Sequence, residues 1–94
     1  MCEERRLAKL EFESGIYVLA AKFASYALAK NPDCFVSWDL LGHASLKTGW
    51  LGEGVDAFEQ AALRKPLSTE SRIELAIAYG ALGRDELSSD LLMI

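Results

Sequence analysis

The sequence has few of the residues that interrupt helices or build covalent and metal sites. It contains two prolines, two cysteines and one histidine among 94 residues. Because proline breaks a helix interior, its scarcity leaves room for long helical segments. The two thiols, Cys2 and Cys34, form no C-x-x-C motif and are too few for the disulfide framework of a short secreted domain. We expect both to be ordinary reduced cysteines.

Long apolar segments and an excess of positive charge are also missing. The longest uncharged apolar run, 16–21, has six residues, whereas a membrane-spanning helix needs about 20. No apolar stretch follows the charged start in the manner of a secretory signal. A net charge of −4 makes a phosphate backbone an unfavourable partner. We therefore expect a cytoplasmic protein that binds neither membranes nor nucleic acids.

The residues that are abundant favour helix. Hydrophobic residues make up 51% of the chain and charged residues 26%, which is a globular composition. Thirteen alanines and fifteen leucines have high helix propensity, and no run of alternating β-branched residues indicates a strand. The length allows one domain. We expect a single all-α domain over residues 1–94.

The same inventory argues against catalysis and cofactor binding. His43 is the only histidine, and Asp39, one helical turn earlier, is the only partner that the spacing places beside it. One histidine and two distant thiols do not make a zinc site, and the glycines form no phosphate-binding loop. We predict a protein that is not an enzyme and has no metal or cofactor, with His43 in a groove or a core.

Internal periodicity is the strongest signal. A shift of 34 residues places Pro32 on Pro66, and Gly15 on Gly49 and Gly83. Small residues recur at the same interval, which marks places where two helices approach closely. Two such sets are Ala8, Gly42, Ala76 and Ala20, Gly54, Ser88. The recurrence predicts repeat units 1–34, 35–68 and 69–94, the last of them incomplete.

Each unit has the pattern of two amphipathic helices. In the second unit, two apolar stripes with 3–4 spacing are separated by Gly49, as expected for a glycine at a left-handed helix end. Lys65-Pro66 ends the second helix, because the residue before proline avoids helical angles. Ser68 is a plausible cap for the next helix. A final helix is expected from Asp85, which makes about six in all.

The second unit also carries a recognisable motif: Trp38-x-x-Leu41-Gly42, Gly49, Gly54-x-x-x-Phe58, Ala61 and Pro66. This 34-residue pattern resembles the tetratricopeptide repeat (TPR). It departs from the repeat at Ser45, where tyrosine is preferred, and at Gly54, where alanine is preferred. The resemblance implies antiparallel helix pairs stacked in a right-handed superhelix, an α-solenoid of about two and three-quarter repeats. An unrelated helix bundle would not need glycine and proline to recur at one interval.

The resemblance further implies a protein-interaction module whose concave groove is lined by the first helix of each pair. The groove positions that it implies are Arg5, Lys9, Phe12, Asp39, His43, Leu46, Lys47, Ile73 and Ile77. A carboxylate clamp like that of heat-shock co-chaperones is disfavoured, because Leu40, Ile77 and Ala81 stand where polar gripping residues are needed. We expect a groove that is basic at its N-terminal end and apolar towards the third unit, suited to an amphipathic helix or an extended peptide.

Two uses of such a groove remain open, because a fold does not fix a function. One is a general peptide-binding module or scaffold. The other is a dedicated chaperone of a bacterial secretion-type system that holds a small helical subunit. Trp50, whose equivalents are Ile16 and Arg84, either packs over the next helix pair or anchors a partner.

The last ten residues add an expected self-association surface. In a helix that begins at Asp85, the side chains of Leu87, Leu91 and Ile94 form one apolar stripe. An apolar stripe of this kind is a contact site for another protein, for the remainder of a longer chain, or for a second copy. Of the three, we expect a symmetric homodimer formed through this helix.

Overall fold

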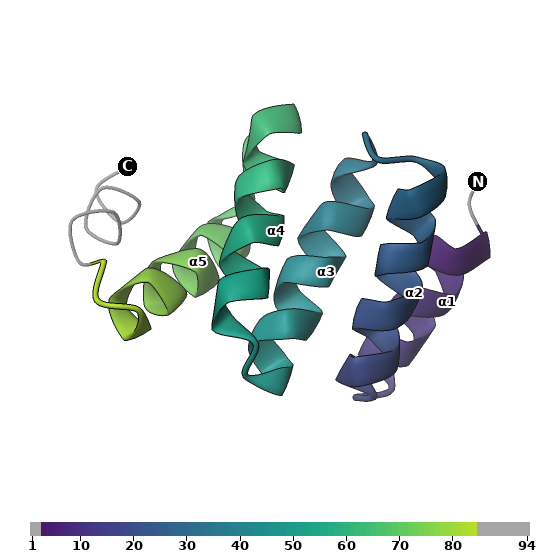
Figure 1. The fold of residues 1–94 in the computed structure, drawn as a ribbon, viewed down its shortest axis with the longest axis horizontal. Helices are drawn as coiled ribbons and strands as arrows, with labels where there is room; N and C mark the ends of the chain where they lie inside the picture. The colour runs from purple at the N-terminus through teal and green to yellow at the C-terminus, as the bar shows by residue number, and fades with distance from the viewer. Residues whose placement is uncertain (1–2, 85–94) are drawn as a thin grey trace.

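Five α-helices joined by short turns make up the structure (Figure 1). The computed structural model describes residues 3–84, with side chains from Arg6 onward. The helices are α1 (Glu3–Glu13), α2 (Tyr17–Lys30), α3 (Phe35–Thr48), α4 (Leu51–Arg64) and α5 (Thr69–Ala81). Over the described range no strand forms, which confirms the predicted all-α class. The sixth helix expected from Asp85 lies outside the described residues.

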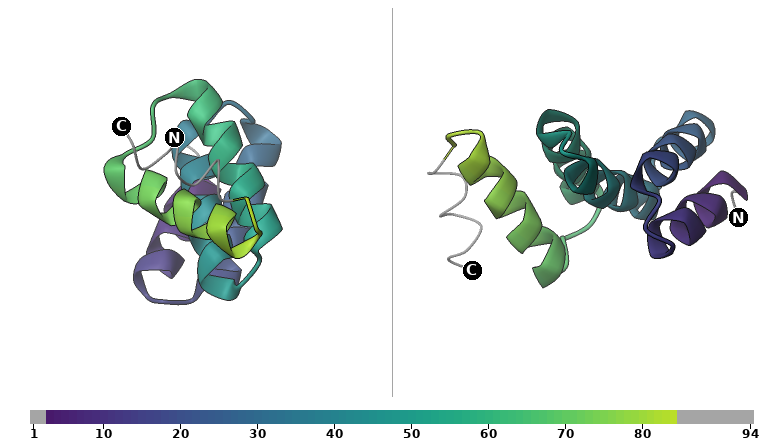
Figure 2. Two further views of the ribbon diagram at one scale, coloured as in Figure 1. Left: turned by 90° about the vertical axis from the view of Figure 1, so that its left-hand side faces the viewer. Right: turned by 90° about the horizontal axis from the view of Figure 1, so that it is seen from below.

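The helices stack in pairs along the chain. Helices α1 and α2 form one antiparallel pair and α3 and α4 the next, while α2 packs on α3 to join the two pairs. Helix α5 contacts both α3 and α4. Figure 2 shows α2 and α4 on one side of the stack, with α1 and α5 flanking α3 on the other. This arrangement places α1, α3 and α5, the first helices of the three units, on a common face.

Glycine and proline end the helices where the sequence indicates. Gly15, Gly49 and Gly83 have positive φ angles of 82°, 88° and 78°, a conformation that side-chain-bearing residues rarely adopt. Helix α4 ends at Arg64, immediately before the extended residue that precedes Pro66. These helix ends confirm the positions that the recurring glycine and proline residues predicted.

Small residues stand where helices cross. A Cβ atom added at Gly42 would lie 2.9 Å from the Phe58 ring, and one added at Gly54 would lie 2.6 Å from the Leu46 side chain. The matching alanines of the other units, Ala8, Ala20 and Ala76, are buried. The recurring small residues thus allow the close helix contacts that the sequence predicted.

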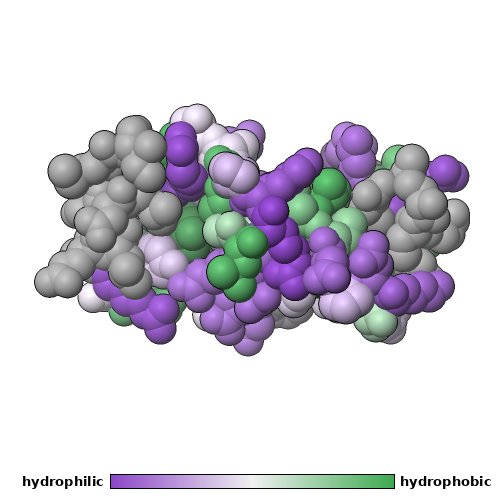
Figure 3. Space-filling view, turned by 90° about the horizontal axis from the view of Figure 1, so that it is seen from above, coloured by the Kyte–Doolittle hydropathy of each residue, from purple (hydrophilic) through white to green (hydrophobic). Residues whose placement is uncertain are grey.

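The side chains that the structure describes, from Arg6 to Arg84, form two core clusters. The larger joins α3, α4 and α5 around Phe58, which is fully buried, with Leu75 and Tyr79 from α5. The smaller joins the first pair to α3 and is built mainly of alanines. Seen from above, the surface shows hydrophobic side chains in small patches separated by hydrophilic ones (Figure 3). Because the smaller cluster consists mainly of alanines, contact between the helices depends on close approach of their backbones as much as on large side chains.

We predict that Ala61→Leu destabilises the domain by about 1–3 kcal/mol, because a larger side chain overpacks a fully closed helix crossing. Ala61 has no exposed surface. The matched control is Ala62→Leu, the same change at the next residue, which is exposed. Urea denaturation measures the unfolding midpoint of each variant. Equal unfolding midpoints for the two would contradict the packing described above.

Candidate functional site

A groove of about 640 Å³ runs between α1 and α3. Basic side chains from α1 line one part of it and aliphatic side chains from α3 another. The lining residues are Arg6, Lys9, Phe12, Glu13, Val36, Asp39 and Leu40. The structure thus brings together three of the residues expected in the groove, Lys9, Phe12 and Asp39. Arg5 belongs to α1, but its side chain lies outside the described part of the chain.

A second hollow of about 170 Å³ lies between α3, α4 and α5. Three expected groove residues, Leu46, Lys47 and Ile77, line it. Ile77 is 67% exposed, and Ile73, one turn earlier on α5, is 45% exposed. The face formed by α1, α3 and α5 therefore has charged side chains of both signs towards α1 and exposed aliphatic side chains towards α5.

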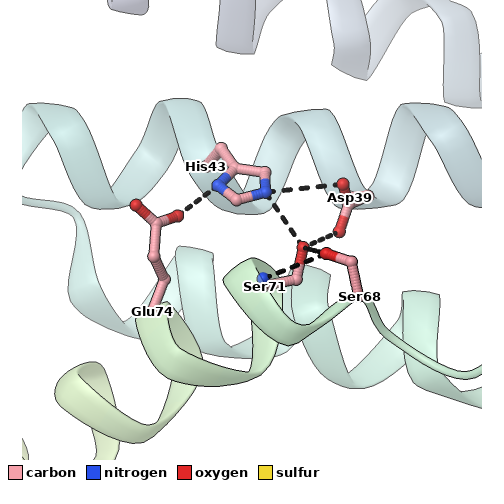
Figure 4. Close-up of polar contacts among 5 residues, drawn as sticks. All are labelled: Asp39, His43, Ser68, Ser71 and Glu74. Carbon is pink, nitrogen blue, oxygen red and sulfur yellow. Dashed lines mark hydrogen bonds and ion pairs between the residues drawn. The ribbon is translucent and has the colours of Figure 1, made fainter.

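His43 lies between these two hollows, where the first turns of α5 meet α3 (Figure 4). Its Nε2 atom is 3.0 Å from Ser71 Oγ and 3.4 Å from Asp39 Oδ2, and its Nδ1 atom contacts the Glu74 carboxylate. The Ser71 hydroxyl donates a hydrogen bond to Asp39 Oδ1 at 2.7 Å. Ser68 caps α5 by accepting the Ser71 backbone N–H at 3.1 Å, which confirms the predicted helix cap.

Aromatic rings enclose the imidazole on its remaining sides. The His43 ring meets Phe58 edge-on with 4.9 Å between centroids, and Phe12 at 6.0 Å. The His43 side chain is 14% exposed. The histidine is therefore partly buried between Phe58, which belongs to the core, and Phe12 and Asp39, which line the groove.

Burial and charge act in opposite directions on His43. Burial lowers its pKa, because the imidazolium loses water, but the hydrogen bond and charge of Asp39 and the nearby Glu74 carboxylate outweigh this effect. The net result is a His43 pKa above 6.5. For Asp39, burial raises the pKa, but hydrogen bonds from His43 and Ser71 lower it below its usual value. The charged forms of Asp39 and His43, which both lie on α3, are thus favoured.

The order Ser71–His43–Glu74 has the connectivity of a hydrolase triad, but the contacts serve a different purpose. The Ser71 hydroxyl donates its proton to Asp39, and Ser71 is 1% exposed. A nucleophile must present its oxygen to a substrate, which this serine does not do. Within residues 3–84, no group of His, Cys, Asp and Glu is arranged to hold a metal ion. The geometry supports a contact that fastens α5 to α3.

The sequence identified Asp39 and His43 but did not identify Ser71 or Glu74 as their partners. Ser71 has one signal, because it is the 34-residue equivalent of Ser37 and both serines are buried. Glu74 has none, since its partner lies 31 residues away and no local pattern connects the two.

The remaining expected contact residues lie away from this face or outside the described range. Trp50 is 44% exposed and lines a separate hollow of about 360 Å³ that α2 and α3 also border. The apolar stripe expected from Leu87, Leu91 and Ile94 lies outside the described residues.

Comparison with known proteins identifies the fold. The sequence matches no family model and no curated protein. Two solved structures of MamA AMB-1 share 23% identity and a TM-score of 0.86 with this chain, covering 96% of it and 49% and 53% of their own chains. MamA MSR-1 has 22% identity and a TM-score of 0.79 over 94% of this chain and 55% of its own.

This chain thus spans about half the length of these neighbours. At such identity the likeness shows the fold alone, and it confirms the predicted helical-repeat fold of the tetratricopeptide type. None of the helices α1 to α5 has the length and apolar character required to cross a bilayer.

We predict that stability falls as the pH rises above about 6.5, the unfolded-state pKa of histidine, through the titration of the only histidine. Because the folded-state pKa of His43 is raised, its contribution is complete below the unfolded pKa of about 6.5. It is lost as the pH passes the raised folded value. The pKa of Asp39 is lowered in the folded state. Its contribution to stability therefore depends on pH in the opposite direction and is lost only in acid.

His43→Gln removes this titration and is the matched control. Urea unfolding midpoints of the parent and the variant, measured across the same pH range, test the prediction. A variant that shows the same decline with pH as the parent would assign the effect to other groups.

Proposed function

We propose that this helical-repeat domain is a non-catalytic protein-interaction module. In this proposal it binds an amphipathic helix or an extended segment of another protein along the face formed by α1, α3 and α5. The observation that carries the proposal is the groove between α1 and α3, about 640 Å³ in volume, which lies on the same face as the exposed aliphatic side chains of α5. Open hollows with apolar walls and a few charged groups are the usual form of a binding site.

The distribution of charge indicates how a partner would lie. Arg6 and Lys9 line the groove at its α1 side together with Glu13, so acidic residues of the partner would be favoured beside the two cations and away from Glu13. Ile73 and Ile77 are bare at the α5 side, where apolar anchors would gain most from burial. An amphipathic helix, whose apolar anchors repeat at helical spacing along one side, matches this division between a charged part and an aliphatic part of the face.

We predict that Ile77→Lys weakens the binding of such a segment by about tenfold or more, because it places a charge in the apolar hollow beside α5. Peptides selected from a random display library against the purified domain serve as probes, and calorimetry measures their affinity. The matched control is Leu63→Lys on α4, since Leu63 is 77% exposed and lines none of the hollows described above.

Retained affinity in Ile77→Lys, or an equal loss in Leu63→Lys, would place the binding face elsewhere.

Binding at the α1 side of the groove should respond differently to salt. Lys9→Glu should reduce affinity mainly at low ionic strength, because exposed charge contacts are screened.

The same selection separates the two uses of the groove. Several unrelated peptide classes with similar anchor spacing would support a general module or scaffold. A single helical sequence, bound far more tightly than all others and in a one-to-one complex, would support a dedicated chaperone of the secretion type.

Self-association through Leu87, Leu91 and Ile94 stays a prediction from the sequence. In a helix that begins at Asp85, the spacing of these three residues would place them on one stripe, which would favour contact with an identical stripe about a two-fold axis. Light scattering at micromolar concentration should show a dimer that Leu91→Lys converts to a monomer, whereas Ser89→Lys, which lies off the stripe, should remain dimeric. A monomeric parent would disprove this assembly.

A further inference from the structure

A hollow of about 360 Å³ lies where α2 meets α3 and the start of α4. It shares no lining residue with the groove between α1 and α3, and its walls are largely apolar. The lining residues are Val18, Ala21, Lys22, Ser25, Leu41, Ser45, Trp50 and Glu53.

The 34-residue register explains why space is left at this position. Ser45 is the equivalent of Tyr79 in the next unit. Tyr79 is only 6% exposed, belongs to the larger core cluster, and donates a hydrogen bond from its hydroxyl to Glu59 at 2.6 Å. The contact of α2 with α3 is the repeat equivalent of the contact of α4 with α5. A serine at the first of these contacts therefore leaves unfilled the volume that a tyrosine ring occupies at the second.

The neighbours of Tyr79 show the same correspondence. Val55 and Leu75 share its core cluster, Glu59 accepts its hydrogen bond, and Asp56 and Arg84 act on its pKa. The 34-residue equivalents of these five residues all line the hollow: Ala21, Leu41, Ser25, Lys22 and Trp50. The hollow is thus the ring site of Tyr79 repeated one unit earlier, without a ring in it.

The floor of this site carries an unused polar atom. Ser45 is 1% exposed, and among the described residues its Oγ atom has no hydrogen-bond partner. A buried hydroxyl without a partner is costly, and such groups are rare in folded proteins. The hollow therefore combines apolar walls with one unsatisfied polar group on its floor.

We propose that this hollow binds the phenol side chain of a tyrosine presented by a partner protein. A tyrosine that enters from solvent leads with its hydroxyl, which would reach Ser45 Oγ while the ring fills the space between Ala21, Leu41 and Trp50. Because that oxygen is sealed from water, the side chains at the rim must move apart, and Val18 and Trp50 are about half exposed. Phenylalanine would fill the walls but leave Ser45 unpaired, so the site prefers tyrosine.

The probes are p-cresol, which is the tyrosine side chain, and toluene, which lacks only the hydroxyl. Titrated into the ¹⁵N-labelled domain, p-cresol should shift the amide resonances of Leu41 and Ser45 and the indole resonance of Trp50. It should bind about fivefold more tightly than toluene, as one neutral hydrogen bond to a buried group predicts. Shifts centred on the groove between α1 and α3, or equal affinity of the two probes, would overturn the proposal.

Two substitutions at Ser45 give independent tests. Ser45→Tyr should fill the hollow from within, abolish the binding of p-cresol and raise the thermal midpoint. Ser45→Ala should retain toluene binding but lose the preference for p-cresol, and it decides the question if Ser45→Tyr does not fold. Ser25→Ala, a change at an exposed serine of the same hollow, is the matched control and should keep the preference. A Ser45→Ala variant that still prefers p-cresol would disprove the role of Ser45.

Discussion

The stack depends on the absence of side-chain bulk where its helices cross. Gly42 faces the Phe58 ring and Gly54 faces Leu46 so closely that neither position has free room for a Cβ atom. Because few of the described residues have large, fully buried side chains, this close approach supplies much of the contact that would otherwise need a thicker core. The small residues recur every 34 residues, so successive helix pairs meet in the same way. That regularity places α1, α3 and α5 on one face.

Helix α5 is held by two chemically different contacts. Leu75 and Tyr79 pack against the core of α4, while the network around His43 ties the start of α5 to α3. Glu74 takes part in this network and also lines the hollow beside Ile77. The position of α5 beside the hollow between α3, α4 and α5 thus depends in part on a polar contact whose strength follows the charge of one imidazole.

The sequence predicts those features that a few neighbouring atoms determine. Positive φ at Gly49, the end of α4 before Pro66 and the cap at Ser68 are local steric or hydrogen-bonding effects, and each was expected. Asp39 and His43 share a helical face because of their spacing. Glu74 could not be assigned to them in the same way, because its contact with His43 is created by the angle at which α5 crosses α3. No spacing within one helix carries that information.

Departures from a repeat are informative because the repeat itself supplies the comparison. Tyr79 and Ser45 occupy the same register position, and one fills its site while the other leaves both a hollow and an unpaired hydroxyl. A random loss of the ring would be expected to be accompanied by larger neighbours that close the space. Here Ala21 stands where the next unit has Val55, Leu41 matches Leu75, and Lys22 and Ser25 are exposed. The buried Ser45 hydroxyl without a partner is costly for folding alone, and a ligand that fills the hollow and bonds to this hydroxyl would offset that cost.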